Sequence, residues 1–190
     1  MSAHNKLRQP ALLASRTVLL LVDFVNPLNF PGAEKLAPFA VDAARRAAAL
    51  RRRLTSEGVR TIYANDNYGL WGTDFRTLWQ SCRASRGEAG VIARALAPRR
   101  PDFALLKPRH SAFYATPLDI LLGQLRCRHL VVAGLAADNC VLFTAMDAYL
   151  RGYSLWIPAD CVAAETEAGK RGALEHMSRV LKAKTAAFDT

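Results

Sequence analysis

The sequence of 190 residues has no long apolar segment. Its longest apolar run, Val18–Val22, is far shorter than the roughly 18–20 residues that a membrane-spanning helix needs. The first residues, Met1–Pro10, are polar and predict no secretory signal. We therefore expect a soluble protein that has no membrane partner and that is located in the cytoplasm.

Cysteine and histidine are scarce, with four residues of each type. The cysteines form no C-x-x-C pair, and no histidine stands at zinc-finger spacing from them, so no metal site is predicted. Without a secretory signal, their thiols are expected to be reduced. The glycine patterns that bind nucleotide phosphates are also absent, and the sequence therefore predicts no cofactor.

Positive charge is abundant, and the formal net charge is +10. Its densest groups, Arg45–Arg46, Arg51–Arg53 and Arg99–Arg100, are expected on helix faces and loops. No aromatic residues are interleaved with them, as a surface that binds single-stranded nucleic acid would require. These observations favour a solvated basic surface, and no nucleic-acid partner is expected.

Short apolar runs alternate with helical patterns along the chain. Thr17–Asp23 is apolar up to its last residue, which is typical of a buried strand. Apolar residues at steps of three and four from Leu36 to Leu54 form one face of a long helix, which Gly58 is expected to end. Further strands are expected at Thr61–Asn65, Phe103–Lys107, His129–Gly134, Ser154–Pro158 and Thr185–Phe188. Further helices are expected near Asp74–Cys82, Gly90–Leu96, Thr116–Leu125, Asp138–Arg151 and Glu167–Leu181.

This alternation predicts an α/β fold, in which right-handed crossovers build a mostly parallel sheet that helices cover on both faces. Residues 15–190 are expected to form one domain, a three-layer sandwich, and residues 1–14 an N-terminal extension. In such sheets, ligands bind beyond the carboxyl ends of the strands, where the strand order reverses. Candidate functional residues are therefore sought at the strand ends.

Chemically active side chains follow three of the expected strands. Asp23 ends the first strand and is expected to face the crevice, because an unpaired carboxylate inside the sheet would be costly. Lys107 ends the third strand. Cys140 lies in the first turn of the helix after the fourth strand, where free backbone amides are expected to lower its pKa. Each residue alone has an ordinary structural explanation, but the combination favours a reactive site.

Three segments carry a resemblance to a known family: VLLLVDFVNP, SAFYATPLD after the third strand, and VVAGLAADNCVLFTAMDAYLRGY. Over roughly Thr17–Phe188, the chain resembles the cysteine hydrolases of the isochorismatase-like superfamily. The resemblance implies a Rossmann-like sheet of six parallel strands and a catalytic triad of Asp23, Lys107 and Cys140. It also implies a homodimer or homotetramer.

The resemblance further implies a cis peptide bond between Leu135 and Ala136 and an oxyanion hole formed by the amides of Ala136 and Cys140. In the implied chemistry, Asp23 takes the thiol proton, and the thiolate attacks the carbonyl of a small amide or N-carbamoyl compound. Asp23 returns the proton to the leaving amine and then activates the water that hydrolyses the thioester. The alternatives are isochorismatase-type hydrolysis and a non-catalytic member of this fold that binds a small molecule.

The sequence constrains the identity of the substrate less than it constrains the catalytic residues. Nicotinamidases of this superfamily carry an Asp-x-His metal site after the second strand, whereas this chain has Asn65–Tyr68 there and no histidine within forty residues on either side. Nicotinamide is therefore not the expected substrate. Isochorismatases proper lack the nucleophilic cysteine, so the presence of Cys140 favours cleavage of a C–N bond. The candidate substrate-binding residues are Phe24, Asn29, Asn65, Trp71 and Tyr114.

Overall fold

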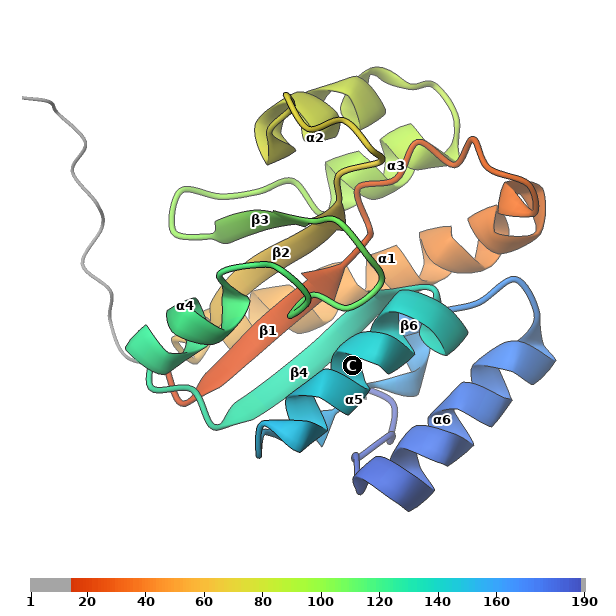
Figure 1. Cartoon of the computed structure of the whole chain (residues 1–190). Helices are drawn as coiled ribbons and strands as arrows, with labels where there is room; N and C mark the ends of the chain where they lie inside the picture. The colour runs from red at the N-terminus through yellow and green to blue at the C-terminus, as the bar shows by residue number, and fades with distance from the viewer. Residues whose placement is uncertain (1–14, 189–190) are drawn as a thin grey trace, which may run out of the picture.

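The computed structural model describes residues 15–188, so the expected N-terminal extension, residues 1–14, lies outside the described residues. Six parallel strands form one sheet in the order β3-β2-β1-β4-β5, and β6 pairs with β4 (Figure 1). The strands are β1 (Thr17–Val22), β2 (Arg60–Asp66), β3 (Phe103–Lys107), β4 (His129–Leu135), β5 (Ser154–Trp156) and β6 (Val162–Ala163). The strand order reverses between β1 and β4, which is where a ligand site is expected in such sheets.

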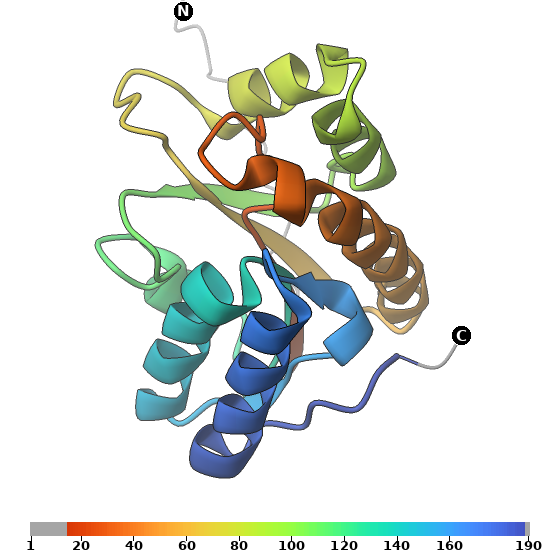
Figure 2. The same ribbon diagram turned by 90° about the vertical axis from the view of Figure 1, so that its right-hand side faces the viewer.

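Helices cover both faces of this sheet (Figures 1 and 2). The helices are α1 (Ala33–Ser56), α2 (Phe75–Ala84), α3 (Glu88–Ala95), α4 (Leu118–Gln124), α5 (Leu142–Leu150) and α6 (Glu167–Leu181). Alternate residues of β1 enter two separate cores: Leu19 and Leu21 pack with α1 and α3, whereas Val18, Leu20 and Val22 pack with α4, α5 and α6. The strand is buried on both sides, and this explains its unbroken apolar sequence.

Two expected elements differ from the structure at the end of the chain. Thr185–Phe188 is not a strand; the β-pairing closest to it is an isolated bridge between Lys184 and Trp156, just before the segment. The sixth strand is instead the two-residue β6, which lies beside the end of β4. A strand of two residues is too short to produce a periodic pattern in the sequence.

Two helix starts also differ. The segment after β4 begins with a π-helical turn, Ala137–Val141, before α5 starts at Leu142. The helix expected from Thr116 starts at Leu118, although the Thr116 hydroxyl accepts a hydrogen bond from the Leu118 amide at 3.3 Å.

One arginine expected on the solvated basic surface is buried. Arg51 on α1 forms an ion pair with Asp102 and donates a hydrogen bond to the carbonyl of Ala97 at 2.8 Å. A buried charge needs such a partner. None of the helices within residues 15–188 is both long enough and apolar enough to cross a membrane.

Candidate active site

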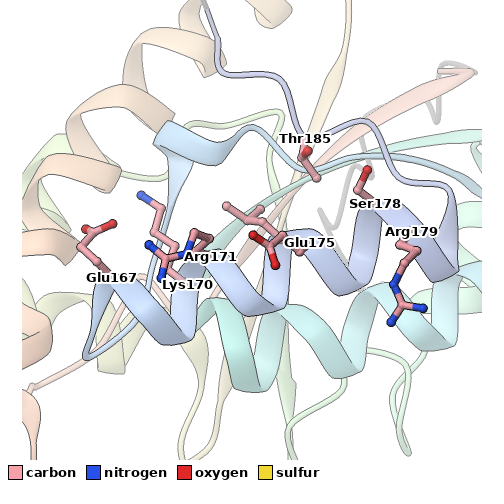
Figure 3. A pocket seen from close by; sticks show the side chains of 8 residues that line it. Glu167, Lys170, Arg171, Glu175, Ser178, Arg179 and Thr185 are labelled. Carbon is pink, nitrogen blue, oxygen red and sulfur yellow. The ribbon is translucent and has the colours of Figure 1, made fainter.

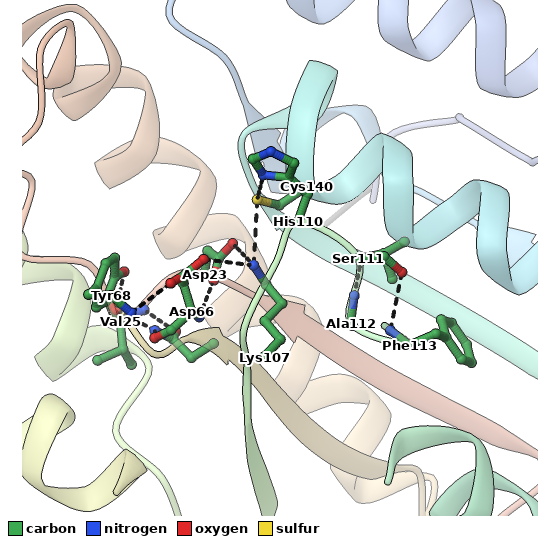
Figure 4. Close-up of polar contacts among 12 residues, drawn as sticks. Asp23, Val25, Asp66, Tyr68, Lys107, His110, Ser111, Ala112, Phe113 and Cys140 are labelled. Atoms are coloured by element: carbon green, nitrogen blue, oxygen red, sulfur yellow. Dashed lines mark hydrogen bonds and ion pairs between the residues drawn. The ribbon is translucent and has the colours of Figure 1, made fainter. Parts of the chain in front are cut away.

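A buried lysine joins two carboxylates at the carboxyl edge of the sheet (Figure 4). The side chain of Lys107, at the end of β3, has no exposed surface, and its Nζ lies 2.7 Å from Oδ2 of Asp23 and 3.6 Å from Oδ2 of Asp66. The other oxygen of Asp23, Oδ1, accepts a hydrogen bond of 2.6 Å from the backbone N–H of Asp66. Asp23 has a φ of 51°, in the left-handed region, as the chain leaves β1.

The thiol of Cys140 completes this cluster. Its Sγ lies 3.5 Å from Nζ of Lys107, which brings sulfur, ammonium and carboxylate together as the sequence predicts. Cys140 is partly exposed, whereas the other three cysteines are buried. Asp23 follows β1, Lys107 ends β3, and Cys140 follows β4. These residues meet because β3, β2, β1 and β4 are consecutive in the sheet and their carboxyl ends lie at the same edge.

Burial and the charges of neighbouring groups together set the pKa values in this cluster. It raises the pKa of Cys140 to about 12; the Asp23 carboxylate adds to the rise, and Lys107 opposes it. Burial also raises the pKa of Asp23 despite the opposing charge of Lys107. For Lys107, burial lowers the pKa, but the neighbouring Asp23 and Cys140 outweigh it, and the pKa is raised.

These shifts correct the expectation that the pKa of Cys140 is lowered. The desolvation of the sulfur and the charge of Asp23 outweigh the opposing effect of Lys107, so the pKa of Cys140 is raised and the thiol is protonated near neutral pH. A carboxylate with a raised pKa is a stronger base than that of free aspartate. The cluster therefore favours transfer of the thiol proton to Asp23 during a reaction over a thiolate that exists beforehand.

Alkylation of Cys140 by iodoacetamide should accelerate with pH. Below a pKa of about 12, the thiolate fraction grows as pH rises, so the rate constant should increase about tenfold per pH unit between pH 7 and pH 9. Peptide mass spectrometry over a time course measures it, with the buried Cys82, Cys127 and Cys161 as slow internal controls. A rate constant that is flat above pH 7 would show that the thiolate is already formed.

The backbone before Cys140 has two special features. The Leu135–Ala136 peptide bond is cis, at the position that the resemblance implies. At Gly134, φ is 153°, and a Cβ would lie only 2.2 Å from the carbonyl oxygen of Val22. Only glycine therefore lets the end of β4 approach β1 this closely, and this approach places the turn that carries Cys140 beside Asp23.

A cavity of about 630 Å³ lies against the cluster. Its lining includes Asp66, Tyr68, Trp71, Arg109, His110 and Tyr114. Two of these residues connect it to the polar cluster, because Asp66 faces Lys107 and Nδ1 of His110 lies 3.7 Å from Sγ of Cys140. Within residues 15–188, no three His, Cys, Asp or Glu side chains are placed to hold a metal ion. The cation between Asp23 and Asp66 is the ammonium of Lys107.

A larger hollow of about 710 Å³ runs along α6 (Figure 3). It is lined by charged side chains, including Glu167, Lys170, Arg171 and Glu175. None of the strand-end residues of the cluster lines it. The smaller cavity is therefore the candidate active site, because only that one adjoins the thiol.

The predicted substrate-binding residues divide into two groups. Trp71 and Tyr114 line the cavity, and both are largely exposed. Asn29 is also exposed but lies outside the lining. Phe24 and Asn65 are buried, a correction to their expected place in the pocket wall: Phe24 packs in the core with α1, and Asn65 holds Val25 through hydrogen bonds of 3.1 Å and 2.7 Å to its backbone.

Two site residues were missed by the sequence analysis. Asp66 ends β2, so the strand-end argument that selected Asp23 would also have selected it. His110 has no comparable signal, because it is an isolated histidine in the segment after β3. Only the fold brings its ring against Cys140, 30 residues away, and packs it against Phe143, with the ring centroids 5.3 Å apart and the ring planes tilted by 32°.

Comparisons with known proteins place the chain in a family. A family model for the isochorismatase domain matches residues 17–187. The isochorismatase family protein YaaI of Bacillus subtilis is 40% identical to this chain, over 87% of the chain and 91% of YaaI. Ureidoacrylate amidohydrolase RutB of Methylorubrum extorquens is 31% identical, over 86% of the chain and 77% of RutB.

The fold is similar to that of solved structures as well. The nicotinamidase SaPncA of Staphylococcus aureus superposes with a TM-score of 0.73 at 24% identity, over 92% of this chain and 99% of that one. The family model and the sequence relatives both identify the isochorismatase family, and the fold is the same as that of the solved structures. The chain therefore belongs to the isochorismatase family of hydrolases.

Proposed function

We propose that this protein is a cysteine amidohydrolase that cleaves the C–N bond of a small amide or N-carbamoyl compound carrying a carboxylate. The observation that carries the proposal is the position of the Cys140 thiol, 3.5 Å from a lysine that is itself 2.7 Å from the carboxylate of Asp23. Burying an ion pair costs desolvation free energy. A protein that only binds a ligand gains nothing from a buried ion pair beside a thiol. A cysteine nucleophile, in contrast, needs a base close to its sulfur.

In the proposed acylation step, Asp23 accepts the thiol proton while Sγ of Cys140 forms a bond to the substrate carbonyl carbon. The positive charge of Lys107 stabilises the sulfur as it becomes anionic, because its Nζ is within hydrogen-bond range of Sγ. The amides of Ala136 and Cys140 are proposed to donate to the carbonyl oxygen as it becomes an oxyanion. When the C–N bond breaks, Asp23 passes the proton to the leaving nitrogen, and a thioester remains.

The carboxylate on the substrate is inferred from the charges that line the cavity. Asp66 faces Lys107, but Arg109 has no ion pair or hydrogen bond with any residue in the range 15–188. A free guanidinium in a binding cavity matches the planar geometry of a carboxylate. RutB, a relative of this chain, is named for ureidoacrylate, which carries both a carbamoyl group and a carboxylate.

An ammonia-release screen with matched substrates tests both parts. Each amide or carbamoyl compound is paired with an analogue that lacks the carboxylate, for example N-carbamoyl-β-alanine with ethylurea. We expect kcat/KM to be about 10- to 100-fold higher for the carboxylates, the size of one charge-assisted hydrogen-bond pair. Arg109→Gln should remove this preference and leave the neutral substrates unaffected.

The control variant is Arg52→Gln, an exposed arginine on α1 outside the cavity, which should keep the preference. No ammonia from any compound would contradict the amidohydrolase. Equal kcat/KM for the two members of every pair would contradict the carboxylate specificity alone.

A further inference from the structure

We infer that Asp66 binds the leaving nitrogen of the substrate and so makes the site specific for a scissile bond that carries an N–H group; this inference rests on the proposed amidohydrolase function. Asp66 contributes the only carboxylate among the residues that line the cavity within the described chain, 15–188. Its side chain keeps 28% of its surface exposed, whereas that of Asp23 keeps 6%. A substrate in the cavity therefore meets the carboxylate of Asp66.

Asp66 is fixed beside the groups that carry out the proposed acylation (Figure 4). Its backbone N–H donates a hydrogen bond of 2.6 Å to Oδ1 of Asp23, and its own Oδ2 lies 3.6 Å from Nζ of Lys107. Sγ of Cys140 lies 3.5 Å from the same Nζ. Because the leaving nitrogen takes its proton from Asp23, it must come close to Asp23 and hence to the neighbouring carboxylate of Asp66.

The carboxylate of Asp66 has acceptor positions to spare. Its Oδ1 accepts a hydrogen bond of 2.6 Å from the amide of Tyr68, whereas its Oδ2 is too far from Lys107 for a normal hydrogen bond. An ionised carboxylate has about four lone-pair positions. Two neighbouring polar groups are engaged: the Tyr68 hydroxyl donates to the carbonyl of Val25 at 3.0 Å, and Oδ1 of Asn67 accepts from a backbone amide at 2.9 Å. Asp66 therefore has an oxygen available for a substrate N–H.

The contact between Asp66 and the substrate strengthens as the C–N bond breaks. When Asp23 transfers its proton, the leaving nitrogen becomes positively charged, and its hydrogen bond to Asp66 becomes charge-assisted. The C–N bond then breaks, ammonia leaves and the thioester remains on Cys140, while Asp66 neither gains nor loses a proton. An interaction that is stronger in the transition state than in the bound substrate raises kcat. An ester oxygen carries no hydrogen besides the one that Asp23 supplies, so an ester gains little from Asp66.

Paired amide and ester substrates test this role. Each pair is a primary amide that is active in the ammonia screen and its methyl ester, for example succinamate and monomethyl succinate. For Asp66→Asn, we expect kcat/KM to fall about 10- to 100-fold for the amide, the size of one hydrogen bond to a charged group, and to stay within about threefold for the ester. Chromatography of the common acid product, succinate, measures both reactions.

Two further variants separate this role from a structural one. Asp66→Asn keeps an oxygen that can accept the Tyr68 amide, and Asp66→Ser keeps a hydroxyl for it, so both should preserve the turn and lose amide hydrolysis selectively. Asp42→Asn, at an exposed position of α1 outside the cavity, should behave as wild type. Losses of equal size for amide and ester in both Asp66 variants would mean that Asp66 acts only by holding Lys107. This result, like an unchanged kcat/KM for the amide, overturns the inference. A wild-type protein that hydrolyses no amide or carbamoyl compound would instead overturn the proposed function.

Discussion

Replacing Cys140 with alanine is expected to lower kcat at least about 1,000-fold, the largest effect on activity that the structure predicts. No other thiol among residues 15–188 approaches the Lys107–Asp23 pair, because the other three cysteines are buried elsewhere in the fold. Ammonia release under saturating substrate measures the loss. Full activity in Cys140→Ala would contradict a cysteine nucleophile.

The same variant should remain folded. Cys140 is partly exposed at the start of a helical turn, so alanine removes little packing, and we expect the melting temperature to stay within about 3 °C. Cys82→Ala is the matched control: Cys82 packs in a small core with Val25 and Leu78, and its loss should cost stability but spare kcat. Substrate binding by calorimetry should persist in Cys140→Ala, because the lining of the cavity is unchanged.

Lys107→Met is expected to have the largest effect on stability. The substitution leaves the carboxylate of Asp23 buried without its ion-pair partner, which typically costs about 3–5 kcal/mol in the free energy of unfolding. Activity should be lost as well, because no cation remains beside the sulfur. Urea denaturation followed by circular dichroism measures the first effect, and ammonia release the second.

A second variant separates charge from shape. When Asp23→Asn is added to Lys107→Met, the unpaired carboxylate disappears, and most of the lost stability should return. Turnover should stay absent, since the base and the cation are both gone. If Lys107→Met unfolds at the same urea concentration as wild type, the ion pair does not carry the stability assigned to it here.

Much of the sheet could be predicted because its strands are buried on both faces. The unbroken apolar run of β1 and the regular three- and four-residue steps of α1 each have one physical explanation. Asp23 and Lys107 could be selected for the same reason. A charged side chain at the end of a buried strand costs desolvation free energy unless it has a partner or a function. The strand ends then meet because parallel strands share one edge.

Other features depend on contacts that no local pattern records. The two-residue β6 forms because β4 offers it a partner, not because Val162 and Ala163 favour a strand. The pKa of Cys140 is decided by how deeply the sulfur is buried, which the position at a helix start does not reveal. His110 lies against Cys140 only because Ser111 and its neighbours bind α5.

The cluster of Asp23, Asp66, Lys107 and Cys140 forms only in the completely folded chain. Asp23 meets Asp66 across 43 residues of sequence, and Lys107 meets Cys140 across 33, each from the end of a different strand. The four groups therefore come together only when β1, β2, β3 and β4 are all paired. A nascent chain, or one with a single strand detached, carries Cys140 as an ordinary thiol without the lysine or the base. Catalysis at this sulfur is therefore a property of the assembled sheet, whereas an incompletely folded chain carries a thiol of ordinary pKa that is open to alkylation and oxidation.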